Sequence, residues 1–201
     1  MWPAVRDRRP SDWATDLGGR HRLEDEMARA LADHPELVLA RRATSSLDDL
    51  DFQVLGPGKR LAQVELKAKH QPYRGWSRLR PELAEPDVFL LDELALRKIV
   101  EAGRYAYMVV VDMPSARWCV WSTVELVLAS KVRAVRTLAT GVTRVKGKVL
   151  LDLREAAVAV ESATAAAGAI AASLSLCDRR WGDIAPWPGG PAVYDPTRRS
   201  S

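Results

Sequence analysis

Charged side chains interrupt two apolar runs between Ser46 and Lys69, and their spacing could support chemistry on a phosphate. The runs LDFQVL and LAQVEL flank GPGKR, where glycine and proline favour a turn, so the segment is predicted to form a β-hairpin. Side chains alternate along a strand, so pairing around this loop places Asp51 opposite Glu65, with Lys67 on the same face. Two carboxylates and an ammonium group on one sheet face could hold a divalent cation beside a phosphate.

The register of the hairpin decides which aspartate takes part. With GPGKR as a five-residue loop, Gln53 faces Gln63 and Asp51 faces Glu65. A slip of two residues would replace Asp51 by Asp49. We favour Asp51 because the tight loop pairs it with Glu65.

A helix is expected over residues 16–33, just before the hairpin. Leu23, Met27 and Leu31 recur at helical spacing and form its apolar stripe. Glu24 lies within this stripe, so its carboxylate is expected to point inward. An unpaired buried charge is costly, so Glu24 needs a partner or a metal ion.

The remaining periodicity predicts one α/β domain with a mixed sheet flanked by helices. The run YAYMVVVD is apolar almost throughout, as in a strand buried on both faces, and DELALRKIVEA is typical of a helix with Asp92 as N-cap and Gly103 after its end. We expect an irregular leader over 1–15, the domain over 16–180 and a Pro/Gly-rich tail over 181–201. Further strands are expected at 36–43, 105–112, 117–121 and 146–153, a short helix at 122–131, and an alanine-rich C-terminal helix at 156–176.

Positive charge is concentrated in two segments, although the net charge of the 201-residue chain is only +4. Lys59–Arg80 holds seven Lys/Arg and one acid, and Lys131–Lys148 holds six Lys/Arg and no acid. Such segregation indicates surfaces for a polyanion, with nucleic acid the leading candidate; two solvated basic faces are the alternative. Aromatic and basic residues alternate after the hairpin, where they could stack on bases or clamp a backbone. The residues predicted to contact nucleic acid are Lys69, Arg74, Trp76 and Arg78.

The cysteines and the apolar segments indicate in which cellular compartment the protein is expected. The two cysteines, Cys119 and Cys177, have neither metal-type spacing nor the density of a disulfide framework, and the N-terminus lacks the apolar stretch of a secretory signal. The alanine-rich segment contains Glu161 and Gly168, which favours a packed helix over a membrane span. We therefore expect a cytoplasmic protein with no membrane partner.

These features together resemble the PD-(D/E)XK nuclease superfamily, the restriction-endonuclease-like fold, over residues 16–153. The family pattern is a helix with an acid, an aspartate near the start of one strand, and (D/E)-x-K on the next. Glu24, Asp51 and the tripeptide Glu65-Leu66-Lys67 match it. The proline of the family name is absent, because Leu50 precedes Asp51.

The resemblance implies a metal-dependent nuclease. Mg²⁺ or Mn²⁺ would be held by Asp51, Glu65, the backbone carbonyl of Leu66 and Glu24. Lys67 would position the attacking water and offset charge on the phosphate, and the products would carry a 5′-phosphate and a 3′-hydroxyl. DNA is the expected substrate, in restriction, phage defence, repair or mobile-element processing, and RNA remains open.

Two other functions compete with this one. A catalytically silent nucleic-acid-binding protein could keep the same fold, and an interaction protein could carry the hairpin acids in solvent. The complete set of Asp51, Glu65 and Lys67 argues against the first, and the two basic segments argue against the second. Because cutting both strands of a duplex generally requires two active sites, we expect a homodimer, with the alanine-rich helix as a candidate interface.

Overall fold

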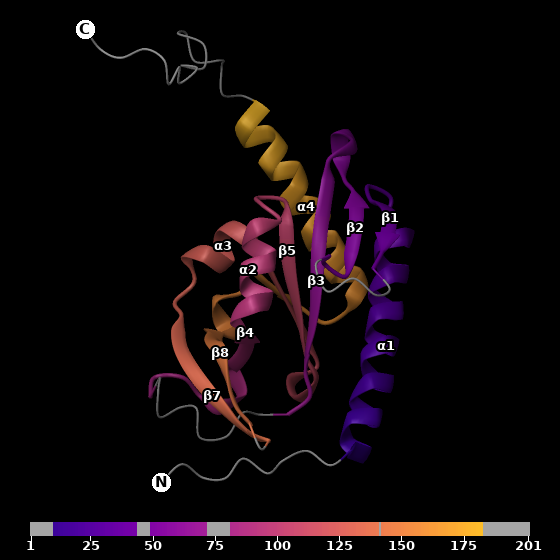
Figure 1. Cartoon of the computed structure of the whole chain (residues 1–201). Coiled ribbons are helices and arrows are strands. Elements are labelled where there is room, and N and C mark those ends of the chain that lie inside the picture. The colour runs from indigo at the N-terminus through magenta and orange to yellow at the C-terminus, as the bar shows by residue number, and fades with distance from the viewer. Residues whose placement is uncertain (1–9, 44–48, 72–80, 141, 183–201) are drawn as a thin grey trace, which may run out of the picture.

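A mixed sheet of six strands forms the centre of the molecule (Figure 1). The computed structural model describes residues 10–43, 49–71, 81–140 and 142–182. In spatial order the sheet runs β1-β2-β3-β5-β6-β9; β3 and β5 are parallel and every other neighbouring pair is antiparallel. Its strands are β1 (Val38–Arg42), β2 (Phe52–Leu55), β3 (Leu61–Lys69), β5 (Ala106–Asp112), β6 (Arg117–Ser122) and β9 (Val158–Val160).

The predicted hairpin is formed by β2 and β3, in the predicted register. Gln53 pairs with Gln63 and Leu55 with Leu61, so the strands have not slipped. The turn between them contains the short 3₁₀ helix η1 (Pro57–Lys59), and Gly58 adopts φ 69° there. Glycine adopts a positive φ at little steric cost, which explains why the turn forms at GPGKR.

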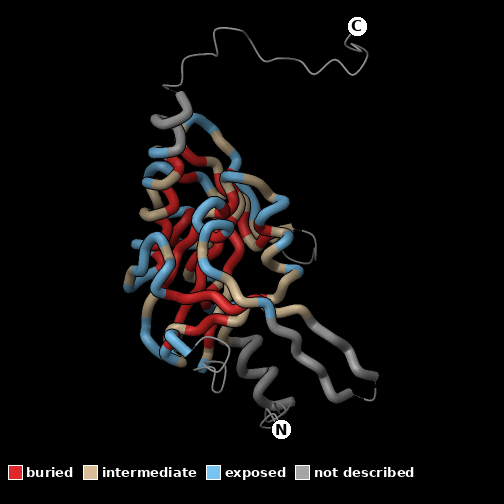
Figure 2. The backbone as a smooth tube through the Cα atoms, turned by 90° about the vertical axis from the view of Figure 1, so that its left-hand side faces the viewer, coloured by how far each residue is buried: buried red, intermediate tan, exposed pale blue. Residues whose placement is uncertain are grey.

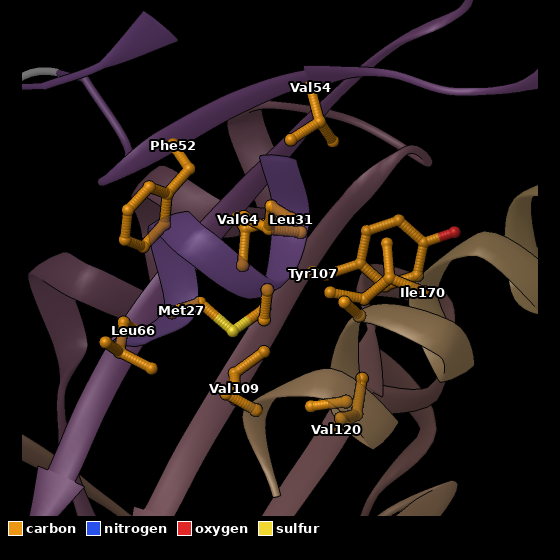
Figure 3. Packing of buried hydrophobic residues seen from close by; sticks show 14 of the residues in the cluster. Met27, Leu31, Phe52, Val54, Val64, Leu66, Tyr107, Val109, Val120 and Ile170 are labelled. Carbon is orange, nitrogen blue, oxygen red and sulfur yellow. The ribbon is translucent and has the colours of Figure 1, made fainter. Parts of the chain in front are cut away.

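Two long helices cover one face of the six-stranded sheet: α1 (Pro10–Asp33) and α4 (Ala163–Gly182). Figure 3 shows Met27 and Leu31 of α1 packed toward Val64 of β3, with Ile170 of α4 close by. These residues belong to one buried apolar cluster that also includes small residues of α4, such as Ala166. The alanine-rich helix is therefore a packed part of the domain, since its small side chains allow close approach to the sheet and to α1.

The other face of this sheet is covered by two short helices and a second sheet. The helices are α2 (Glu93–Glu101) and α3 (Thr123–Leu128), and the three-stranded antiparallel sheet has the order β4-β8-β7. Met108 and Trp121 of the large sheet share a buried cluster with Ile99 of α2, Leu126 of α3 and Phe89 of β4. Figure 2 shows that the buried segments, drawn in red, run through the middle of the molecule. The strands of the second sheet are β4 (Val88–Asp92), β7 (Val132–Thr140) and β8 (Val142–Asp152).

The structure confirms a single α/β domain with a mixed sheet flanked by helices, and it confirms several local predictions. The short helix expected at 122–131 is α3, which begins with a capping box between Ser122 and Glu125, and Gly103 follows α2 with φ +88°. The second sheet was not predicted, because no strand was expected at Val88–Asp92, and Val132–Thr140 has no strong apolar alternation.

Two helix boundaries differ from the prediction. Helix α1 begins at Pro10, so residues 10–15 of the expected leader are helical. The C-terminal helix begins at Ala163 rather than near Ala156, because Val158–Val160 pairs with β6 as an edge strand. No helix in the described part of the chain is long and apolar enough to cross a membrane.

Candidate active site

The hairpin brings Asp51, Glu65 and Lys67 together. The Lys67 ammonium group contacts Glu65 Oε1 directly, and the negative charge of Asp51 acts on the Glu65 carboxyl. Glu65 is paired with Met108 and Lys67 with Val110 across the β3–β5 ladder, which places both residues on the sheet face covered by α2. Side chains alternate between the two faces along β3. Leu66 therefore lies in the core under α1, and Glu65 and Lys67 lie on the opposite face.

The Asp51 carboxylate lies against the main chain of β3. Its Oδ2 accepts a hydrogen bond from the backbone N–H of Leu66, with an N···O distance of 2.7 Å. The backbone pairing of β2 with β3 ends at Phe52 and Val64. Beyond this pair, it is the side chain of Asp51 that accepts the hydrogen bond from β3. This contact fixes the carboxylate beside Glu65.

Glu65 is the buried member of the group, with 6% of its surface exposed. Burial raises the pKa of its carboxyl above the ordinary value; the positive charge of Lys67 lowers the pKa, Asp51 raises it, and Lys98 of α2 lowers it. A buried carboxylate beside a second carboxylate is a favourable place for a cation. Lys67 is more accessible, with 27% of its side chain exposed, so the group is open to solvent on the lysine side.

Lys98 is a neighbour of the site that the sequence analysis missed. It lies on α2 next to the buried Ile99, and its positive charge lowers the pKa of the Glu65 carboxyl. The helical pattern around Lys98 was clear, but it did not indicate which sheet face α2 would cover.

Asp49 is held apart from Glu65 by a different partner. Its carboxylate forms an ion pair with Arg41 of β1, at 3.0 Å. Because the hairpin is in the unslipped register, Asp51 rather than Asp49 is the aspartate beside Glu65.

Glu24 is held on the α1 side of the sheet. Its Oε2 lies 3.3 Å from Arg42 of β1 and 3.6 Å from His21, and its side chain is 13% exposed. The inward orientation expected from the helical stripe is present, and Arg42 is the partner that such a carboxylate requires. Within the described residues, no three His, Cys, Asp or Glu side chains form a group suited to a metal ion.

Lys69 is buried, with 0% exposure, and this corrects the expectation that it contacts nucleic acid. Its ammonium group contacts the carbonyl of Pro86 and lies 3.4 Å from the Asp112 carboxylate. Arg117 binds the other oxygen of Asp112 at 2.9 Å and also binds Asp87. Lys69 therefore belongs to an ion network that joins the large sheet to the chain entering β4.

The other residues predicted to contact nucleic acid, Arg74, Trp76 and Arg78, lie outside the described residues. The described chain ends at Gln71, directly after β3, and resumes at Pro81. The prediction for these three residues stays a prediction.

The residues at this site fit Mg²⁺ or Mn²⁺. Mg²⁺ usually keeps several waters and binds through one or two carboxylates together with substrate phosphates, so it does not require a cage of three or four protein acids. Asp51 and the buried Glu65 supply two such oxygen donors. A bound cation would offset the two effects that raise the pKa of Glu65, which are burial and the negative charge of Asp51.

Comparison with known proteins assigns no relative: no family model, curated protein or solved structure matches the chain.

Proposed function

We propose that this protein is a metal-dependent nuclease that hydrolyses phosphodiester bonds of DNA. The observation that carries the proposal is the buried Glu65 carboxylate between Asp51 and Lys67, on a sheet face that also receives the charge of Lys98. A buried acid whose pKa is raised, beside a second acid and in contact with a lysine, is unusual as a purely structural arrangement and suits work on a phosphate.

The proposed roles follow from the chemistry of each side chain. Asp51 and Glu65 would hold Mg²⁺ or Mn²⁺, which acidifies a bound water and stabilises charge on the phosphoryl oxygens. The Leu66 N–H keeps the Asp51 carboxylate in place, and burial keeps Glu65 from rotating into solvent. Lys67, partly exposed beside Glu65, orients the attacking water and offsets negative charge on the scissile phosphate.

The order of elements supports the same proposal. Helix α1, the β2–β3 hairpin, helix α2 and the buried strand β5 follow one another as the resemblance to the PD-(D/E)XK superfamily implies. Glu24 departs from the family pattern because Arg42 and His21 surround its carboxylate. We therefore assign Glu24 a structural role at the α1–β1 contact and limit the proposed ligands to Asp51, Glu65 and the carbonyl of Leu66.

The test is cleavage by the parent protein and by two lysine variants. We expect labelled duplex DNA to be cut with Mg²⁺ or Mn²⁺ and left intact with EDTA. Lys67→Ala should lower the cleavage rate by about 10²–10⁴-fold, because water positioning and charge stabilisation are removed together. Lys59→Ala, in the turn of the same hairpin, is the matched control and should cut at the parent rate.

Binding is measured separately, with EDTA present, so that loss of binding is not mistaken for loss of catalysis. Lys67→Ala should still bind DNA. Cleavage by Lys67→Ala at the parent rate would refute the assignment of the site. If the parent leaves DNA and RNA of duplex, branched and single-stranded form uncut with either metal, the proposed activity is wrong.

A further inference from the structure

The sheet face that carries Glu65 and Lys67 continues along the hairpin without a helix over it. On β5 and β6 this face is buried under α2 and α3, as Met108 and Trp121 show. On the hairpin it is half-exposed, and in Figure 1 no helix of the described chain lies in front of β2 or β3. We call this uncovered surface the open platform; its residues are Val38, Arg41, Gln53, Leu55, Leu61 and Gln63.

Strand pairing places the hairpin residues of the open platform on one face. Gln53 is the partner of Gln63, and Leu55 is the partner of Leu61. Residues paired across an antiparallel ladder, and residues two apart along a strand, lie on the same face. Gln63 is two residues from Glu65 and Leu61 is four. At about 3.3 Å per residue, the platform therefore extends from about 7 to about 13 Å from the proposed catalytic group.

Strand β1 adds two residues to the same face. Arg41 is the partner of Gln53 and Val38 is the partner of Leu55, with a register irregularity between them on β1. Arg41 is the charged residue of the platform, and its guanidinium group forms an ion pair with Asp49 at 3.0 Å. With that partner the platform is electrically neutral.

The rest of the platform combines aliphatic side chains with neutral hydrogen-bonding groups. Val38 is 61% exposed and Leu61 is 49% exposed, and Leu55 between them is half-buried. Gln53 and Gln63 are also half-buried, and the amide of each both donates and accepts hydrogen bonds. A nucleobase has the same two properties, a flat apolar ring and an edge of donors and acceptors, whereas a phosphate backbone requires cations. The platform therefore matches bases better than phosphates.

We propose that the open platform binds unpaired nucleobases of the strand whose phosphate lies at Asp51, Glu65 and Lys67. A nucleic acid held there extends its neighbouring nucleotides over the adjoining part of the same face. In a duplex the bases are stacked and their pairing edges are occupied, so they cannot make these contacts. The inference rests on the proposed nuclease function and narrows its substrate to DNA with unpaired nucleotides beside the cut, with plain duplex as the weaker substrate.

The test compares two exposed leucines. Leu61→Ser alters the platform, and Leu128→Ser, on α3 with 79% exposure, is the matched control. Three ligands are used: a single-stranded DNA oligonucleotide, the blunt duplex of the same sequence, and a strand of the same length made of abasic sites. Binding is measured by fluorescence anisotropy with EDTA present, over a range of salt concentrations.

We expect Leu61→Ser to bind the single strand about tenfold more weakly than the parent, because its apolar contact with a base is lost. The slope of log affinity against log salt should be unchanged, since no phosphate contact is removed. Binding to the duplex and to the abasic strand should equal that of the parent, and Leu128→Ser should match the parent with all three ligands.

A second platform variant removes the two amides. Gln53→Thr with Gln63→Thr introduces residues that suit strands and should give the same pattern as Leu61→Ser, with single-strand binding about tenfold weaker. Because Leu61 is exposed, its variant decides the question if the glutamine variant does not fold.

Parental affinity for the single strand in either folded platform variant would overturn the inference, as would an equal loss of affinity for the abasic strand or the duplex. A parent that does not bind the single strand would overturn it too. Sedimentation tests a second copy of the chain as the occupant. A dimer that Leu61→Ser dissociates would show that the platform is a contact between copies and not a surface for bases.

The outcome is separable from that of the nuclease test. A parent that binds the single strand through the platform without cutting any DNA refutes the proposed hydrolysis and leaves base binding standing. A parent that cuts DNA while the platform variants bind the single strand normally refutes the inference and leaves the nuclease standing.

Discussion

Replacement of Asp51 separates its two roles, as an acceptor for the main chain and as a carboxylate for a cation. Asp51→Ala removes the acceptor of the Leu66 N–H at 2.7 Å, in a part-buried position. A buried donor without a partner costs about 1–3 kcal/mol, so Asp51→Ala should lower the free energy of unfolding by that amount. Asp51→Asn retains an oxygen at the same place. It also relieves repulsion with Glu65, so its stability should stay within about 1 kcal/mol of the parent.

The two variants should be equally inactive despite their different stabilities. Neither carries the negative charge that we assign to cation binding, so Mg²⁺ should raise the unfolding midpoint of the parent and not that of either variant. Urea unfolding with EDTA and with Mg²⁺, followed by circular dichroism, measures both effects. Asp49→Asn, which alters the carboxylate paired with Arg41, is the control and should keep the Mg²⁺ response. Cleavage by Asp51→Asn at the parent rate would refute the reasoning, and so would an Asp51→Ala protein as stable as the parent.

Two further predictions concern the buried acid and the packed helix. Because the pKa of Glu65 is raised in the folded protein, the folded state binds more protons than the unfolded state as pH rises from the ordinary value of 4.5 through the raised pKa, and the free energy of unfolding falls over this window. Glu65→Gln should lack this decline in urea unfolding without metal; parallel curves for parent and variant would contradict it. Ala167 of α4 is 0% exposed, so Ala167→Leu should overpack the contact with the sheet and lower the free energy of unfolding by about 1–3 kcal/mol, whereas Thr164→Leu on the exposed face of α4 should leave it unchanged. A stable Ala167→Leu protein would show that the contact adapts easily.

Much of the site was predictable because the hairpin is local in sequence. The loop GPGKR defines the turn length, and the alternation of the two arms then defines which residues are opposite each other. The contact of Lys67 with Glu65 and the closeness of Asp51 to Glu65 follow from this register. Neither prediction needed knowledge of distant parts of the chain.

The positions of Glu24 and Lys69 were not predictable in the same way. The stripe of α1 indicated that Glu24 points inward, but only the docking of α1 against β1 places Arg42 at its carboxylate. The basic composition around Lys69 suggested a surface, whereas the chain entering β4 covers it and supplies the Pro86 carbonyl. Both outcomes depend on contacts between segments far apart in sequence.

The sequence alone determined the short-range features of this protein: the hairpin register, the α2 helix, the buried strand β5 and the concentration of charge in Lys131–Lys148. These follow from turn chemistry and side-chain periodicity, which act over a few residues. Only the tertiary structure decided which sheet face each helix covers, and therefore that the charge of Lys98 acts on Glu65 while Glu24 lies on the opposite side. It also decided that β4 stops short of the β7–β8 turn, because strand pairing depends on how distant segments meet.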